Sequence, residues 1–157
     1  LMSTATREIA QYYKGRKYLI CQQGYDRAEQ YAKERGYHLY SSGGSVATTA
    51  LDIAVYFQAA AIIFVGLDLA FTGDQMHATG SGIQAEISEG ETVIEVPAIG
   101  GGMVRTCRPF AMCREWIERR IAQPDATMPI YDATEGGAKI KGTRICKLAD
   151  VFCGDKE

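Results

Sequence analysis

The chain lacks a long apolar run, a charge excess of either sign and a paired-cysteine motif. No stretch approaches the roughly 18 apolar residues that a membrane-spanning helix needs, so we expect no membrane span. The formal net charge is −2 over 157 residues, which argues against a nucleic-acid-binding or polybasic membrane surface. A local cationic site for phosphate is compatible with this balance.

The five cysteines are odd in number and none stands in a CxxC pair, so neither a disulfide framework nor a zinc site is expected. We predict a reduced, cytoplasmic protein without a metal site. The N-terminus carries no signal-peptide pattern. Leu1 precedes Met2, which favours a trimmed piece of a longer protein.

The length fits a single domain over residues 1–157, and hydrophobic and charged fractions of 46% and 23% are typical of a globular protein. Apolar runs and helical periodicity alternate along the first part of the chain. The expected helices are residues 3–13, 26–35 (stopped by Gly36), 45–57 and 109–122, and the expected strands are 17–22, 38–40, 61–65 and 128–131. Alternating strands and helices with short connections favour an α/β fold with a mostly parallel sheet, in a Rossmann-like, three-layer arrangement.

Two further segments, residues 91–97 and 103–107, flank "AIGGG" and predict an added hairpin or flap. The helix at 109–122 is strongly amphipathic, and Pro109 suits its first turn. Its apolar side is expected to consist of Phe110, Met112, Trp116, Ile117 and Ile121.

The first candidate site is the turn Ser41-Ser42-Gly43-Gly44-Ser45, between an expected strand and an expected helix. Free N–H groups and the helix dipole favour an anion there, and glycines let the backbone approach a phosphate. The alternative is structural, with Ser45 capping the helix and the two glycines making the turn. The pattern is neither a Walker loop nor GxGxxG, and it leaves both readings open.

The second candidate is Gly66-Leu67-Asp68, directly after the apolar run "AIIFV". Ligands of open α/β sheets bind outside the carboxyl ends of the strands. Asp68 could bind a sugar or ribose hydroxyl, or it could hold the loop by accepting backbone N–H bonds.

Two further candidates lie in polar segments. Thr72 and His77 stand in the long Gly-rich stretch 66–90, where Thr72 could contact substrate phosphate and His77 could act as a general base; an isolated surface histidine usually has no such role. Lys139 and Lys141 alternate in "DATEGGAKIKGT" and could meet phosphate or a sugar carboxylate. Alternatively, these lysines protect an exposed edge.

Taken together, "GGSVATTALDIAVYF", "IIFVGLDLAFTGDQMHATG", "CREWIERRI" and "YDATEGGAKIKGT" resemble the motility accessory factor family of bacterial proteins associated with flagellin glycosylation. The resemblance extends from residue 41 to about 145. It implies transfer of a nonulosonic, sialic-acid-like sugar from a CMP-activated donor to Ser or Thr of flagellin or another acceptor protein. The donor would be a substrate, and no cofactor is implied.

A remoter resemblance links the same core to bacterial sialyltransferases, and it implies roles for individual residues. Ser42 and Gly43 match the nucleotide-contacting turn, Gly66 and Asp68 match the strand-end motif, and His77 is the matching base. The family's longer members carry an upstream half with a "GPSL"-type turn, which residues 1–40 lack. The chain therefore resembles the C-terminal part of the family domain.

Archaeal 6-hydroxymethylpterin pyrophosphokinases of the MptE-like type share the "G-x-D" core, which leaves a diphosphokinase as an alternative. Such an enzyme would need ATP and Mg²⁺, hence a second carboxylate converging with Asp68. Along the sequence, Asp74 is the only nearby candidate. A third alternative is a non-catalytic nucleotide- or protein-binding module, since a fold alone does not imply function.

Overall fold

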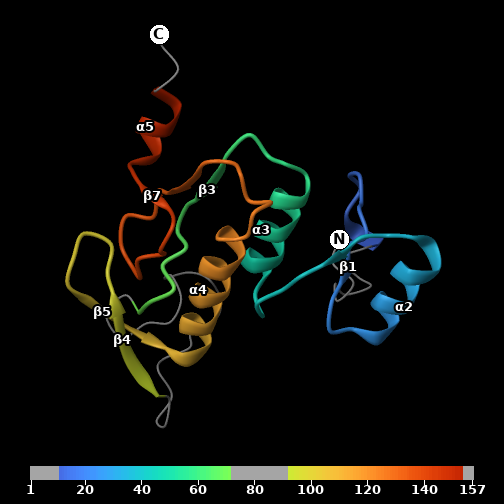
Figure 1. The fold of residues 1–157 in the computed structure, drawn as a ribbon, viewed down its shortest axis with the longest axis horizontal. Helices are drawn as coiled ribbons and strands as arrows, with labels where there is room; N and C mark the ends of the chain where they lie inside the picture. Colours follow the sequence, from blue (N-terminus) through green and yellow to red (C-terminus); the bar gives the residue numbers. More distant parts are fainter. Residues whose placement is uncertain (1–10, 72–91, 154–157) are drawn as a thin grey trace. The chain divides into compact units, whose positions relative to one another are not determined.

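The computed structural model describes residues 11–71 and 92–153. The chain divides into two compact units, residues 1–53 and 54–157, and Figure 1 labels most of their elements. The dividing point falls inside helix α3 (Val46–Tyr56).

The first unit is built on one strand–helix–strand crossover. Strand β1 (Cys21–Gln22) pairs in parallel with β2 (Leu39–Tyr40), and helix α2 (Asp26–Arg35) connects them. Ala28 and Ala32 lie one helical turn apart and pack with Cys21 in a small core. The parallel pairing expected from the sequence is confirmed here.

Helix α2 has the bounds that its sequence predicts. Asp26 and Glu29 stand in its first turn, where acidic side chains interact favourably with the helix dipole. Gly36 ends it in the left-handed conformation (φ 68°), which glycine adopts without a Cβ clash. The N–H groups of Gly36 and Tyr37 both donate to the carbonyl of Ala32, so these two bonds close the last turn of the helix on one carbonyl.

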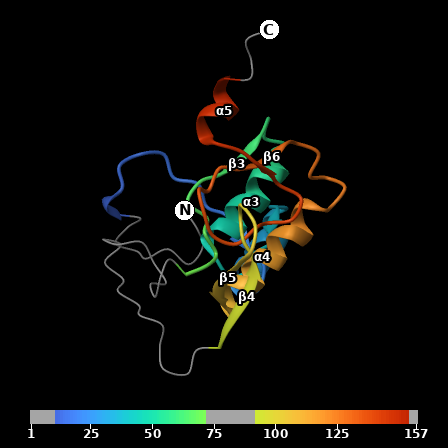
Figure 2. The same ribbon diagram turned by 90° about the vertical axis from the view of Figure 1, so that its left-hand side faces the viewer.

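The second unit contains a three-stranded parallel sheet in the order β3-β6-β7. Strands β3 (Ile62–Phe64) and β6 (Ile130–Asp132) pair along their whole length, with Phe64 opposite Asp132. Figure 2 shows these two strands side by side. Strand β7 (Arg144–Ile145) continues the sheet beyond β6.

The expected hairpin is confirmed. Strands β4 (Val93–Pro97) and β5 (Met103–Cys107) pair antiparallel, from Val93 opposite Cys107 to Pro97 opposite Met103. Three consecutive glycines at 100–102 turn the chain, all at positive φ. Strand β5 leads directly into helix α4 (Arg108–Ile121), as Figure 1 shows.

Helix α4 carries its Pro in the first turn, as expected, but one residue of the predicted apolar side is wrong. The buried residues are Ala111, Cys113 and Ile117, whereas Met112 is 58% exposed. At about 100° per residue, Met112 lies nearly opposite Ile117 on the helix. Predicting burial of Met112 from its apolar character alone was therefore wrong.

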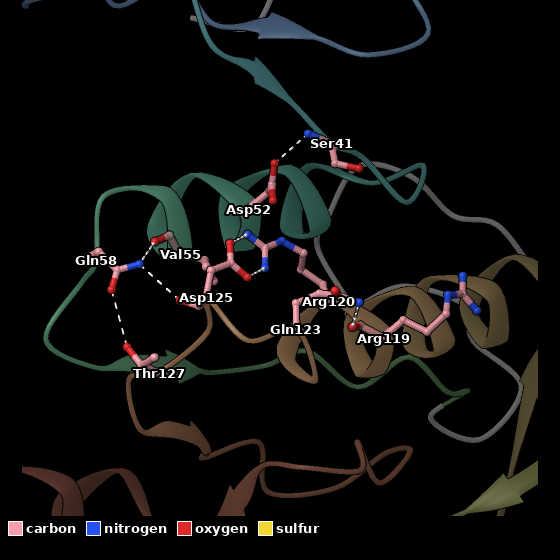
Figure 3. Close-up of polar contacts among 9 residues, drawn as sticks. All are labelled: Ser41, Asp52, Val55, Gln58, Arg119, Arg120, Gln123, Asp125 and Thr127. Atoms are coloured by element: carbon pink, nitrogen blue, oxygen red, sulfur yellow. Dashed lines mark hydrogen bonds and ion pairs between the residues drawn. The ribbon is translucent and has the colours of Figure 1, made fainter.

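The turns after α3 and α4 are joined by polar contacts (Figure 3). The Gln58 amide donates to the carbonyls of Val55 (2.9 Å) and Asp125 (3.1 Å). Arg120 holds the Asp125 carboxylate with two bonds of 2.9 and 3.0 Å, and this arginine lowers the pKa of Asp125. These contacts hold the segment before β3 against the segment before β6, at the amino ends of both strands.

The sequence did not predict β7 or helix α5 (Leu148–Cys153). Most of the expected helix 3–13 lies outside the described residues. The Rossmann-like three-layer arrangement, the single domain and the likeness to sialyltransferases stay predictions, whereas the mixed α/β class is confirmed. Within residues 11–71 and 92–153, no helix is long and apolar enough to cross a membrane.

Candidate functional site

Two acidic residues lie where the chain leaves the carboxyl end of the parallel sheet in the second unit. Asp68 follows β3 by four residues, and Asp132 is the last residue of β6. Because β3 and β6 are parallel neighbours, both residues leave the sheet at the same edge. This edge is where open α/β sheets bind their ligands.

The main chain around Asp68 is held on both sides by the loop after β6. The N–H of Leu67 donates to the hydroxyl of Thr134 at 3.1 Å. The carbonyl of Asp68 accepts the N–H of Ala138 at 2.7 Å. The loop-holding role expected for the Asp68 side chain is thus performed largely by partners of its backbone.

Gly137 makes this approach possible. Its φ of +87° favours glycine, and an added Cβ would lie 2.3 Å from the carbonyl oxygen of Asp68. On its other side, the carbonyl of Gly137 accepts the N–H of Ile99 at 3.0 Å. The loop therefore passes between Asp68 and the hairpin end, with no room for a side chain.

Asp132 is fully buried, and its two carboxyl oxygens differ. Oδ1 accepts the backbone N–H of Thr134 at 3.1 Å, while Oδ2 has no hydrogen-bond partner within the described ranges. Burial raises the pKa of Asp132, the Thr134 N–H and hydroxyl oppose this, and the charge of Asp68 adds to the rise. Burial dominates, so the surroundings favour the neutral acid.

The sequence patterns give Asp132 no role. The rule that singled out Asp68, an acidic residue where a buried strand ends, applies equally to "IYD" at 130–132. Asp132 was instead grouped with the loop that follows, because the strand was expected to end at Tyr131. One residue of error at the strand end hid the second carboxylate.

The two lysines of this loop are not brought to one place. Both are exposed. The N–H of Lys139 donates to the carbonyl of Pro97 (2.7 Å) on the hairpin, whereas the N–H of Lys141 donates to Glu118 of α4 (2.9 Å). Lys141 also lines an open pocket of about 440 Å³, together with Glu115, Glu118, Arg119, Ile121, Ala122 and Gly142.

In the first unit, the turn Ser41–Ser45 is organised by the buried Thr48. The Thr48 hydroxyl accepts the N–H groups of Gly43 (2.9 Å) and Ser45 (3.3 Å) and donates to the Ser45 carbonyl (2.6 Å). Ser45 Oγ in turn accepts the N–H of Thr48. Ser45 and Thr48 thus form a reciprocal cap, of the kind usually made with Glu or Gln at the second position.

Two further bonds complete the turn. The Ser42 hydroxyl accepts the N–H of Gly44 at 3.2 Å, and Asp52 accepts the N–H of Ser41 at 2.6 Å, as Figure 3 shows. These contacts are those of the structural alternative, a capped helix start. In the part of the chain that the structure describes, the N–H groups of Val46 and Ala47 have no protein acceptor. Nucleotide binding at the turn stays a prediction.

Replacing Thr48 with valine is expected to loosen the turn. The isosteric change removes the acceptor of two N–H groups and the donor to one carbonyl, so we expect a loss of roughly 2–3 kcal/mol in the free energy of unfolding. Thr49→Val is the matched control, because the buried Thr49 hydroxyl makes one long contact of 3.5 Å to the Ser45 carbonyl. Urea unfolding compares the two variants, and equal losses would contradict the organising role of Thr48.

Three sequence-predicted residues, Thr72, Asp74 and His77, lie outside the described residues. Gly66 is exposed, at φ +64°, and Asp68 is partly exposed. Among residues 11–71 and 92–153, no three His, Cys, Asp or Glu side chains gather as metal ligands would.

The described elements thus define an α/β protein with acidic residues at the carboxyl end of a small parallel sheet. Residues 1–74 match the model of the MptE-like family, described as 6-hydroxymethylpterin diphosphokinase MptE-like. This match includes the Ser41–Ser45 turn, Asp68, and also the first forty residues, where the sequence motifs are less clear. The placement in the C-terminal part of the family domain stays a prediction.

One curated relative is an uncharacterised protein of Treponema pallidum (strain Nichols). It is 51% identical over 43 residues, which is 27% of this chain and 11% of that protein. The chain thus matches about a tenth of the relative's length. No solved structure matches the chain.

Proposed function

We propose that the chain carries part of the site of a nucleotide-dependent transferase, which moves a nonulosonic sugar from a CMP donor to a hydroxyl of an acceptor protein such as flagellin. The observation that carries the proposal is the strand-end Asp68, partly exposed while its main chain is fixed on both sides. The match of residues 1–74 to a family named for a nucleotide-dependent transfer supports the nucleotide part of the proposal.

In this chemistry, the acceptor oxygen attacks the anomeric carbon of the sugar. The bond from that carbon to the CMP phosphate oxygen breaks, and CMP leaves with the bonding electrons. A general base takes the acceptor proton; His77 is the proposed base, and Asp68 the group that orients a hydroxyl or shares the proton. The helix start after Ser41–Ser45 is the proposed group that stabilises the departing phosphate. Lys139 and Lys141 are kept as separate proposed phosphate contacts of the second unit.

A diphosphokinase is the second candidate, because Asp132 supplies a second carboxylate beside Asp68. Such a second carboxylate is what an ATP- and Mg²⁺-dependent reaction requires, and along the sequence only Asp74 stands close to Asp68. Against it stands the state of Asp132. Its side chain is fully buried and its pKa is raised, whereas Mg²⁺ needs ionised oxygens that it can reach together with its waters. We therefore place sugar transfer first.

The third candidate is a binding module without catalysis, and it is tested by substitution of the proposed catalytic base. Calorimetric titration with CMP, ATP and ATP plus Mg²⁺ separates a CMP site from the ATP site of a diphosphokinase. We expect CMP to bind preferentially, and Ser42→Ala to weaken CMP binding about fivefold through loss of the hydroxyl that holds Gly44. Thr49→Val is the control that leaves this hydroxyl intact.

His77→Ala then distinguishes an enzyme from a module. The transferase loses turnover but keeps CMP affinity, whereas a binding module is unaffected. Binding of ATP that requires Mg²⁺ would replace the first candidate with the diphosphokinase. Absence of binding in all three titrations would overturn a nucleotide site in this chain.

A further inference from the structure

We propose that Thr134 is a positioning residue for Asp68: its hydroxyl fixes the main chain in front of Asp68 and so sets the direction of the carboxylate at the proposed transfer site. The inference rests on the proposed function for the role of Asp68, but its geometry is independent of the ligand.

The first step is the bond that precedes Asp68. Strand β3 ends at Phe64, so the N–H of Leu67 lies beyond the sheet ladder and needs another acceptor. The Thr134 hydroxyl provides it at 3.1 Å, and Thr134 is only 4% exposed. A hydrogen bond shielded from water in this way is costly to break, because the N–H would be left without a partner.

The second step is that Thr134 is itself held in place. Oδ1 of Asp132 accepts the Thr134 N–H, two residues further on, which is the geometry of an Asx turn. The last residue of β6 thus orients Thr134, and Thr134 orients the segment after β3. The parallel strands transmit their register into the loop that carries Asp68.

The third step is the conformation that follows Asp68. Leu69 has φ +46°, a left-handed conformation that non-glycine residues seldom adopt. It is buried, and its carbonyl accepts the Thr106 hydroxyl at 2.8 Å. Such strain persists where neighbouring contacts over-determine the backbone, which is frequent at functional sites. With the Asp68 carbonyl bound to Ala138, only the side-chain torsions of Asp68 are left to vary.

The test compares Thr134→Val, which keeps the shape but lacks the acceptor, with Thr134→Ser, which keeps the hydroxyl. Thr143→Val is the control for the loss of one hydroxyl bond, because the Thr143 hydroxyl donates locally to the Ile140 carbonyl (2.8 Å). For each variant we would follow the ¹³C chemical shift of the Asp68 carboxyl carbon at one fixed pH, the exchange of the Leu67 amide, and the affinity for CMP.

We expect Thr134→Val to change the ¹³C chemical shift of the Asp68 carboxyl carbon, speed Leu67 exchange at least tenfold and weaken CMP binding at least fivefold. Thr134→Ser should restore the chemical shift and bring exchange and affinity to within about twofold of the unmodified chain, and Thr143→Val should leave all three unchanged. An unaltered Asp68 chemical shift in Thr134→Val, or a serine variant as impaired as the valine variant, would overturn the positioning role. Failure of the unmodified chain to bind CMP would overturn the proposed function instead, while the chemical shift and amide exchange still decide the role of Thr134.

Discussion

Gly137→Ala is expected to cost roughly 2–5 kcal/mol of the free energy of unfolding, from backbone strain and overpacking together. Gly137 has φ +87°, and the new Cβ would lie 2.3 Å from the carbonyl oxygen of Asp68 and 2.6 Å from its Cα. Those atoms belong to a main chain held by Ala138 and Thr134. A flexible side chain could turn away, but this backbone cannot.

Gly136→Ala is the control for this change. No heavy atom lies within 4 Å of an ideal Cβ at Gly136, and its φ is not in the left-handed range. We expect Gly136→Ala to change the free energy of unfolding by less than about 1 kcal/mol. The change should be an increase, because alanine reduces the conformational entropy of the unfolded chain. Urea unfolding of both variants measures the difference, and similar losses would contradict the close approach at Gly137.

The second large effect concerns Asp132 and pH. Burial raises its pKa above the usual value of 3.8, so the folded state holds this proton more tightly than the unfolded state. The contribution of Asp132 to stability is therefore fully present below the unfolded pKa, and is lost as pH rises through the folded pKa. Asp132→Asn, a neutral isostere of the acid, should remove this dependence and be more stable at neutral pH by roughly 1–3 kcal/mol.

The measurement is the difference in unfolding free energy between the chain and Asp132→Asn, from about pH 3.5 to 8. Other carboxylates also make stability depend on pH, and Asp125, whose pKa is lowered by Arg120, does so in the opposite direction. Both proteins contain these carboxylates, so most of their effect cancels in the difference. Asp132→Ala is the companion variant. It lacks the acceptor for the Thr134 N–H and should be destabilised at every pH. A difference that is flat over this range would refute the raised pKa.

Local sequence signals predicted much of the fold because the elements carry their own start and stop signals. Helix α2 runs from an acidic first turn to the left-handed Gly36, and the hairpin turns on three glycines at positive φ. The short β7 has no such pattern, since both of its residues are exposed. The prediction for Met112 was wrong for the opposite reason. Its apolar side chain suggested burial, but its position on helix α4 leaves it exposed.

The candidate site was predictable only in part. Asp68 follows from a rule about strand ends, and the Ser41–Ser45 turn from a rule about helix starts. The contacts that fix Asp68 do not follow, because they join residues about seventy positions apart: Leu67 to Thr134, and Asp68 to Ala138. No local pattern in "GLDLA" encodes a partner in "DATEGGA". Asp132 is missed for another reason, because the predicted strand ends one residue too early, at Tyr131.

That separation also has a consequence for synthesis of the chain on the ribosome. The stretch around Asp68 emerges from the ribosome long before its hydrogen-bonding partners. Thr106 binds Leu69, Thr134 binds Leu67 and Ala138 binds Asp68. Closing such long loops costs entropy before any contact compensates for it, and contacts of this kind form slowly. The acidic strand end should therefore be among the last parts of the second unit to mature. A nascent chain halted before Ala138 would display Asp68 without the geometry that gives it a role.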